Sequence, residues 1–252
     1  MANISLTVLF FVVGLLVGSF LNVIILRLPE GESPVLGRSK CPKCQKKIAF
    51  YDLIPLLSYV ILQGKCRNCK AYVSLQYPIV EIISGISFVF LLNRSGFSYL
   101  LFLYLVAISA LIIIFVYDLR YLEIPEIFAW LFLAVTIILG VTQSNFSLAN
   151  FLLGGLVGGG ILGILVGISD ERLMGAGDIK IGLAFGFLFG YPQALLFLFL
   201  SFIVGAVIGL ILIAIKGKKL KSEIAFAPFM IIAGIITFIW GGTIISSYLS
   251  LI

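Results

Sequence analysis

The feature that most constrains this chain is the recurrence of apolar stretches long enough to cross a lipid bilayer. A helix needs about 20 mainly apolar residues to span the hydrocarbon core. Only 11% of the 252 residues are charged, against roughly 25% in soluble domains. The sequence therefore predicts an all-α polytopic membrane protein with about eight transmembrane helices. The candidate spans, the sixth of them short, are residues 4–27, 79–93, 98–117, 126–141, 148–169, 178–190, 193–215 and 225–246.

The basic residues predict how these helices are oriented. Of the 17 lysines and arginines, all except Arg94 fall on one side of the predicted membrane. Because cytoplasmic loops are enriched in Lys and Arg, we expect this side to be cytoplasmic and both termini to lie outside. The first apolar stretch has no basic segment before it and is too long for a cleaved signal. We therefore expect it to remain as a transmembrane helix.

One segment, residues 28–78, is polar and basic and contains all four cysteines, as Cys41-Pro-Lys-Cys44 and Cys66-Arg-Asn-Cys69. Two such pairs are typical of a closed tetrahedral zinc site, and disulfides are disfavoured in the cytosol. So short a segment also needs a staple to fold. The sequence therefore predicts a first transmembrane helix (1–27), a cytosolic zinc-binding loop domain (28–78) and a multi-helix membrane domain (79–252). One structural zinc ion per chain would be bound by Cys41, Cys44, Cys66 and Cys69.

The chain contains no histidine, which excludes Ser-His-Asp and Cys-His catalysis and a catalytic zinc with imidazole ligands. General acid–base chemistry would therefore use carboxylates, lysine or tyrosine. Asp118 directly follows the apolar residues 111–117, and Asp178 opens the sixth span within Gly175-Ala-Gly-Asp178. Ionisable groups at this depth are costly and indicate function, although an aspartate can also simply cap a helix.

Two carboxylates on one membrane face can act together if they lie close to each other. Both cannot ionise cheaply, so one is protonated while the other is charged. In aspartic proteases such a pair activates water and polarises the scissile carbonyl. A transporter remains an alternative, but transporters usually place acidic residues near the bilayer midplane and contain repeats, and no convincing repeat is evident here. A membrane scaffold that docks through the zinc loop is a further alternative.

A series of short motifs makes the chain resemble a known family. Gly175-Ala-Gly-Asp178 resembles the Gly-x-Gly-Asp motif of intramembrane aspartyl proteases, and the whole chain resembles the prepilin peptidases of type IV pilus, competence and type II secretion systems. Many members of that family have Asp where this chain has Glu126. The other motifs that carry the resemblance are Gly18-Ser-Phe-Leu-Asn-Val, Arg27-Leu-Pro, the cysteine pairs, Tyr51-Asp-Leu-Ile-Pro, Leu56-Leu-Ser-Tyr, Gly64-Lys-Cys, Tyr77-Pro-Ile-Val-Glu, Asp118-Leu-Arg-Tyr-Leu-Glu-Ile-Pro and Ala227-Pro-Phe.

The resemblance implies that Asp118 and Asp178 form the catalytic pair of an enzyme in the bacterial cytoplasmic membrane. Such an enzyme removes short basic leaders from prepilins and pseudopilins at the cytoplasmic face, and methylates the new N-terminal residue with S-adenosylmethionine. The residues themselves show no nucleotide-binding loop. Asp52, Glu81 and Gly64 are the candidates for methyl transfer, and a peptidase without that activity remains an alternative. The expected partners are prepilins and the lipid bilayer, without nucleic acid.

Overall fold

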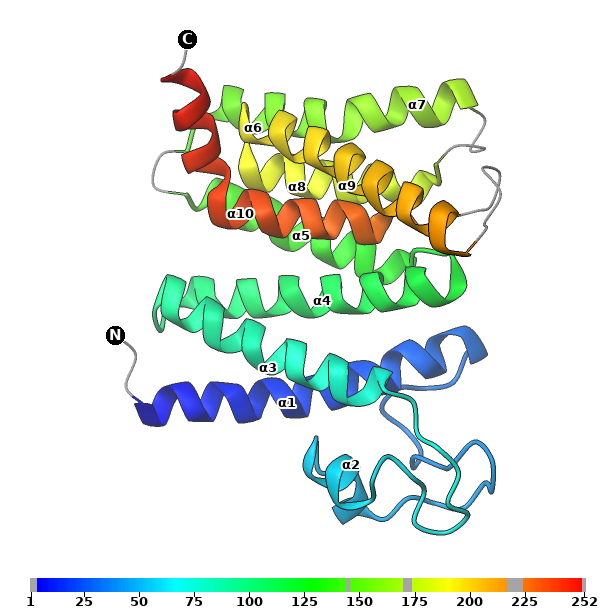
Figure 1. The fold of residues 1–252 in the computed structure, drawn as a ribbon. Helices are drawn as coiled ribbons and strands as arrows, with labels where there is room; N and C mark the ends of the chain where they lie inside the picture. The colour runs from blue at the N-terminus through cyan, green and yellow to red at the C-terminus, as the bar shows by residue number, and fades with distance from the viewer. Residues whose placement is uncertain (1–3, 144–145, 170–173, 217–223, 251–252) are drawn as a thin grey trace. The chain divides into compact units, whose positions relative to one another are not determined.

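The computed structural model describes residues 4–143, 146–169, 174–216 and 224–250, and every regular element within these ranges is a helix (Figure 1). Arg172, Lys218, Lys219 and Lys221, which contribute to the predicted charge asymmetry, lie outside the described residues. The longer helices are α1 (Ile4–Arg27), α3 (Gln76–Ser95), α4 (Tyr99–Tyr121), α5 (Glu126–Val141), α6 (Leu148–Gly155), α7 (Ile161–Ser169), α8 (Ala176–Phe189), α9 (Gln193–Lys216) and α10 (Ala227–Leu249). Shorter elements are η1 (Leu28–Glu30), η2 (Phe50–Leu53), α2 (Leu57–Ile61) and the π-helical turn η3 (Leu156–Gly160).

The chain divides into two compact units, residues 1–113 and 114–252, and the division falls within α4. In the first unit α1 packs closely on α3 because small residues face each other. A Cβ atom added at Gly14 would lie 2.7 Å from the Cα atom of Gly85, and one at Gly18 would lie 2.7 Å from the Cα atom of Glu81. Close approach through small residues is the usual way in which membrane helices associate.

A buried polar side chain joins α1 and α3 where the loop of residues 28–75 begins and ends. The Asn22 amide nitrogen donates to the carbonyl oxygens of Gly18 at 3.3 Å and Tyr77 at 3.2 Å. Gln76 in turn donates to the Asn22 amide oxygen at 3.2 Å. Both the nitrogen and the oxygen of the buried Asn22 amide therefore have hydrogen-bond partners, as buried polar groups normally do. The two helices hold the ends of the loop together.

In the second unit α8 packs against the continuous helical segment α6–η3–α7. Glycines allow the two backbones to touch: a Cβ atom at Gly158 would lie 2.2 Å from the Gly182 carbonyl oxygen, and one at Gly154 would lie 2.4 Å from the Gly186 carbonyl oxygen. The glycine-rich stretch of residues 154–163 thus allows close helix packing, as small residues in membrane helices usually do. On another side of α8, Phe185 contacts Phe132 of α5 and Phe197 of α9, with ring centroids 5.1 and 4.8 Å apart.

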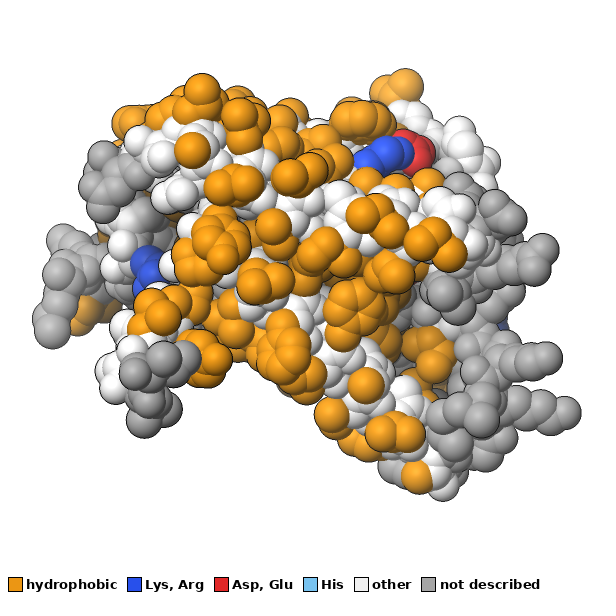
Figure 2. Space-filling model, turned by 90° about the horizontal axis from the view of Figure 1, so that it is seen from above, with side chains coloured by type: hydrophobic (Ala, Val, Ile, Leu, Met, Phe, Trp, Pro, Cys, Tyr) orange, Lys and Arg blue, Asp and Glu red, His pale blue; other side chains and the backbone are white. Residues whose placement is uncertain are grey.

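All eight predicted spans are helical, but eight is an approximate count of membrane crossings. Among the described residues six helices are long and apolar enough to cross a bilayer, and α5 and α8, with 16 and 14 residues, are shorter. Figure 2 shows hydrophobic side chains spread over one face, with few charged groups among the described residues visible there. A lipid-facing surface explains this composition. The six long helices are Ile4–Glu30, Gln76–Ser95, Tyr99–Tyr121, Leu148–Ser169, Gln193–Leu212 and Ala227–Leu249.

The glycine contacts lead to a prediction about stability. We expect Gly158→Ala to destabilise the protein by about 1–3 kcal/mol, the usual cost of overpacking, because the new methyl group would overlap the Gly182 carbonyl oxygen. Gly163→Ala is the matched control, since a Cβ atom at Gly163 meets nothing within 4 Å. Thermal unfolding in detergent measures both. An unchanged midpoint for Gly158→Ala would contradict the packing of α8 described here.

Candidate active site and metal centre

Asp118 lies in the last turn of α4, directly after an apolar run, and it is buried within the second unit. Its side chain is only 4% exposed. Directly after α4, Leu122 adopts a positive φ of 57° and donates its N–H to the Asp118 carbonyl oxygen at 2.9 Å, which ends the helix. The Asp118 carboxylate accepts a hydrogen bond from the backbone N–H of Ala227, the first residue of α10. The α10 N-terminus, a favourable place for negative charge, therefore faces Asp118.

Asp178 lies in the first turn of α8 and is 5% exposed. Gly175 precedes the helix in an extended conformation, and the two residues hydrogen-bond reciprocally. The Gly175 N–H donates to Asp178 Oδ2 at 3.2 Å, and the Asp178 N–H donates to the Gly175 carbonyl oxygen at 3.1 Å. This satisfies two backbone groups at the helix start, as a capping box does. A carboxylate at this end of a helix is also stabilised by the helix dipole.

The fold brings Asp118 and Asp178 together, although 60 positions separate them in the sequence. The two carboxylates are close enough for their charges to interact. One oxygen of each, Asp118 Oδ2 and Asp178 Oδ1, is buried without a hydrogen-bond partner among the described residues. Buried polar atoms are normally partnered, so such an exception needs an explanation. Each of these two oxygens can accept a hydrogen bond that no described residue donates.

An ion pair lies close to Asp178. Lys180 Nζ is bonded to Glu126 Oε2 and stands over the Trp130 ring, 5.0 Å from its centroid. Because Glu126 and Trp130 belong to α5, these contacts join the starts of α5 and α8. Glu126 is exposed, so the pair adds little stability by itself. Glu126 is therefore bonded to Lys180.

The four cysteines form the second cluster, in the first unit. Their Sγ atoms all lie within 4.8 Å of one another, and Cys41 Sγ is 3.8 Å from Cys69 Sγ. A tetrahedral metal with bonds of about 2.3 Å to sulfur holds neighbouring sulfurs about 3.8 Å apart. Hydrogen bonds, first from the Cys44 backbone N–H, lower the pKa of the Cys41 thiol to about 7, whereas burial and hydrogen bonds to the other three thiols raise the pKa of Cys69 to about 11. A bound metal would displace the protons of all four thiols. The cluster can therefore hold one metal ion.

The two cysteine pairs have the same backbone structure, offset by 25 residues. Cys41 N–H donates to Lys46 at 3.0 Å, and Cys66 N–H donates to Ala71 at 2.8 Å, five residues ahead in each case. The bridge Lys40–Lys47 likewise recurs as Lys65–Tyr72. In the sequence only the Cys-x-x-Cys pairs indicate this repeat, because hydrogen bonds between backbone groups define the rest of it.

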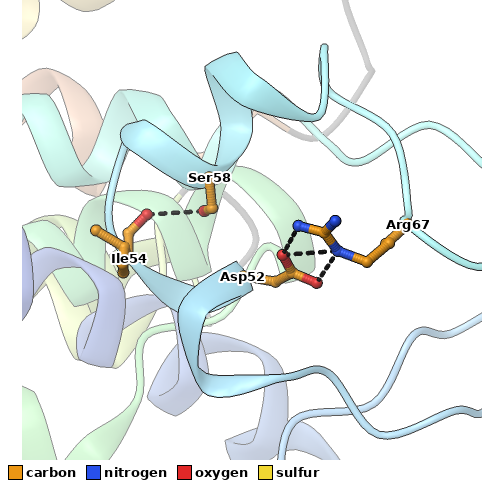
Figure 3. Close-up of polar contacts among 4 residues, drawn as sticks. All are labelled: Asp52, Ile54, Ser58 and Arg67. Carbon is orange, nitrogen blue, oxygen red and sulfur yellow. Dashed lines mark hydrogen bonds and ion pairs between the residues drawn. The ribbon is translucent and has the colours of Figure 1, made fainter.

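The three residues considered for methyl transfer all contact the segment that contains η2 and α2. Both Asp52 oxygens accept from Arg67, at 2.6 to 3.1 Å (Figure 3). These hydrogen bonds hold the pKa of the Asp52 carboxyl below its usual value. The structure thus gives each residue a partner within the loop or at its edge. Glu81 accepts from the Leu56 N–H at 2.9 Å, and a Cβ atom at Gly64, whose φ is 66°, would lie 2.8 Å from the Tyr59 hydroxyl.

Sequence reasoning missed the polar cluster beside Glu81. Asn22, Ser84 and Glu81 are buried between α1 and α3, and Ser19 hydrogen-bonds Glu81. Polar side chains within an apolar span were the available signal, because they are costly there unless they have a role.

The fold and the two clusters define a polytopic helical membrane protein with a buried aspartate pair and a loop that contains a cluster of four cysteines. Comparison with known proteins gives the family. The model of the bacterial peptidase A24 N-terminal domain matches residues 12–95, and that of the type IV leader peptidase family matches residues 105–210. The chain belongs to the type IV leader peptidase family.

Relatives along nearly the whole chain support this assignment. A prepilin leader peptidase/N-methyltransferase of Bacillus subtilis is 32% identical over 244 residues, which cover 96% of this chain and 97% of the relative. Proteins of the same name from Stutzerimonas stutzeri and Legionella pneumophila are 31% and 32% identical, over 94% and 96% of this chain and 92% and 94% of their own lengths. No solved structure matches the chain significantly.

The geometry of the Gly-x-Gly-Asp turn predicts that its two glycines tolerate side chains differently. A Cβ atom at Gly177 would lie 3.0 Å from the Ile124 side chain, whereas one at Gly175 meets only Asp178 Oδ2, at 3.9 Å. We therefore expect Gly177→Val to lower the thermal unfolding midpoint, by overpacking that costs about 1–3 kcal/mol, and Gly175→Val to change it less. Thermal unfolding of both purified variants tests this. Equal midpoints would contradict the Gly177–Ile124 contact.

Proposed function

We propose that this protein is a membrane aspartic endopeptidase that removes the short basic leader from type IV prepilins and pseudopilins and methylates the new N-terminal residue. The observation that carries the first activity is the buried pair Asp118 and Asp178, each with one carboxylate oxygen that has no partner in the described parts of the chain. The names of the relatives, prepilin leader peptidase/N-methyltransferase, support the substrate and the second activity. The transporter and scaffold alternatives receive no support from this family.

Peptide hydrolysis by this pair divides the acid and base roles between the two carboxyl groups. Two neighbouring negative charges repel, so the pair retains one proton. The charged carboxylate takes a proton from water as the water oxygen adds to the scissile carbonyl carbon, and the protonated carboxyl donates to the carbonyl oxygen. Collapse of the tetrahedral intermediate then breaks the C–N bond, and the leaving amine takes up a proton. Asp118 and Asp178 supply both groups, which a chain without histidine requires.

The proposed site faces the cytoplasm. In the first unit the loop between α1 and α3 contains nine basic residues when Arg27 is included, while Arg94 lies at the opposite end of α3. This asymmetry is what the positive-inside rule predicts for a cytoplasmic loop. By the alternation of spans, the C-terminal end of α4 with Asp118 and the start of α8 with Asp178 lie on the same side.

Zinc is the metal that the four cysteines fit best, because a closed set of four thiolates is typical of structural zinc sites. Cys41, Cys44, Cys66 and Cys69 would hold it, and it would supply stability to a loop that has few buried residues. S-adenosylmethionine is the proposed methyl donor. Asp52, Glu81 and Gly64 support its site by fixing the η2–α2 segment.

The aspartates yield the central prediction. Asp118→Asn and Asp178→Asn should each lower cleavage of a prepilin by about 10²–10⁴-fold, the usual effect of removing a positioned acid or base. Leader release by purified protein in detergent measures this. Glu126→Gln, which changes an exposed carboxylate outside the pair, should retain most of the activity. If either asparagine variant kept more than about a tenth of the activity, the assignment would be wrong.

The cysteine cluster predicts about one zinc ion per chain. Elemental analysis of the purified protein should find it, and Cys66→Ser should lose it because the closed site needs all four thiolates. Tyr72→Ser, at an exposed position three residues after Cys69, is the control and should retain the metal. Undiminished zinc in Cys66→Ser would reject the site.

Loss of the metal should affect the two activities unequally. The residues considered for methyl transfer contact the loop, whereas both aspartates lie in the other unit. We expect a Cys66→Ser, Cys69→Ser double variant that still accumulates to lose methyl transfer more than cleavage. Mass spectrometry of the same reaction reports both, as leader release and as a mass gain at the new N-terminus. Equal loss would show that the loop supports the whole fold.

A further inference from the structure

A segment of the loop, residues 50–62, is unlike the rest of it. It contains one charged residue, Asp52, which is paired with Arg67. Basic residues flank it on both sides, at Arg38, Lys40, Lys43, Lys46 and Lys47 before it and at Lys65, Arg67 and Lys70 after it. The loop therefore contains an uncharged stretch between two basic ones.

The apolar side chains of this segment are exposed on one side of α2. Leu57, Val60 and Ile61 are 54%, 71% and 64% exposed, and their i, i+3, i+4 spacing places them on one helix face. Leu53 and Ile54 of the preceding turn are exposed as well. The other face of α2 is held by the loop: the Tyr59 hydroxyl donates to the Val73 carbonyl oxygen at 3.2 Å, and the Gly64 N–H donates to the Tyr59 carbonyl oxygen at 2.9 Å. The exposed face is thus fixed in direction.

A hydrogen bond sets the depth of this segment relative to the membrane-spanning helices. The Leu56 N–H, directly before α2, donates to Glu81 Oε2 at 2.9 Å, and Leu56 adopts a positive φ of 59°. Glu81 lies five residues inside α3, which corresponds to about 7.5 Å along the helix axis. In Figure 1, α2 is drawn below α1 and α3, beside the end of α3 at which the loop joins it, and it does not extend past the ends of the two helices. The apolar face of α2 consequently lies level with residues of α3 that themselves belong to a span.

We propose that residues 50–62 insert into the membrane interface, with Leu57, Val60 and Ile61 among the upper acyl chains and the flanking basic residues against anionic headgroups. An apolar helix face bordered by Lys and Arg is the composition of interfacial segments. The neighbouring surface of α3 is continuous with it in character, because Ile79, Ile82 and Ile83 are also exposed. Lipid is the occupant that matches the depth, the apolar face and the basic border together. This surface would hold the cysteine cluster at a fixed distance from the membrane interface. The proposal does not depend on the proposed catalysis.

Fluorescence in lipid nanodiscs tests this insertion directly. The chain has two tryptophans, Trp130 and Trp240, so a Trp130→Phe, Trp240→Phe background leaves a single reporter at Val60→Trp. Nanodiscs that contain anionic lipid would be prepared with and without bromine on the acyl chain just below the glycerol. We expect brominated lipid to reduce the Val60→Trp emission by about twofold or more, as a residue buried 5–10 Å into the boundary requires, and aqueous iodide to have little effect.

Tyr72→Trp in the same background is the control, because Tyr72, three residues after Cys69, is 83% exposed. It should be quenched by iodide and less by brominated lipid. Ile61→Trp, on the same face as Val60, replaces Val60→Trp if that variant does not fold, and retention of the bound metal reports folding. Quenching of the Val60 reporter by iodide as strongly as that of Tyr72 would overturn the proposal, since the segment would lie in water. Protection from both quenchers would overturn it too, because protein would cover the face.

Discussion

The cost of burying charge away from water is the constraint on which the structure of the second unit depends. Asp118 and Asp178 are almost completely buried, and each keeps one carboxylate oxygen without a partner among the described residues. Such an arrangement persists only if the surroundings compensate for lost hydration. Compensation comes from the backbone at two helix starts: the Ala227 N–H of α10 for Asp118, and the Gly175 N–H beside α8 for Asp178. Each aspartate therefore needs a helix terminus at a fixed place.

The glycines determine where one of those termini lies. Backbone contact at Gly158–Gly182 and Gly154–Gly186 sets the position of α8 against α6–η3–α7, and the aromatic contacts of Phe185 hold its other side. Because packed interiors transmit small displacements, a shift of α8 would move Asp178 relative to Asp118. The glycine-rich stretch is thus linked to the proposed chemistry although none of its residues is acidic or basic.

In the first unit, a buried carboxyl group is also partnered by a backbone N–H, but there the bond holds a loop in place. Its loop has little core of its own, so it depends on the cysteine cluster and on hydrogen bonds to the helices that border it. Glu81 is central because it is buried in α3 and accepts from the Leu56 backbone. That bond gives the buried Glu81 carboxyl group a partner inside a span. It also fixes the η2–α2 segment, whose apolar face is left exposed. A buried acidic residue can in this way be structural in one unit while a pair of them is proposed as catalytic in the other.

The sequence by itself determined the helical membrane architecture, the cysteine pairs and the identity of the two aspartates as candidates, because these follow from local composition and spacing. Apolar length predicts spans, and the absence of histidine leaves carboxylates as the acid–base groups. The number of crossings was less certain, since α5 and α8 are short and length alone does not decide whether a helix crosses. Only the tertiary structure decided that Asp118 and Asp178 lie close enough for their charges to interact, that Glu81 accepts from Leu56 and that Asp52 is paired with Arg67. These contacts join residues 60, 25 and 15 positions apart, and helix packing and the path of the loop, not local pattern, bring such residues together.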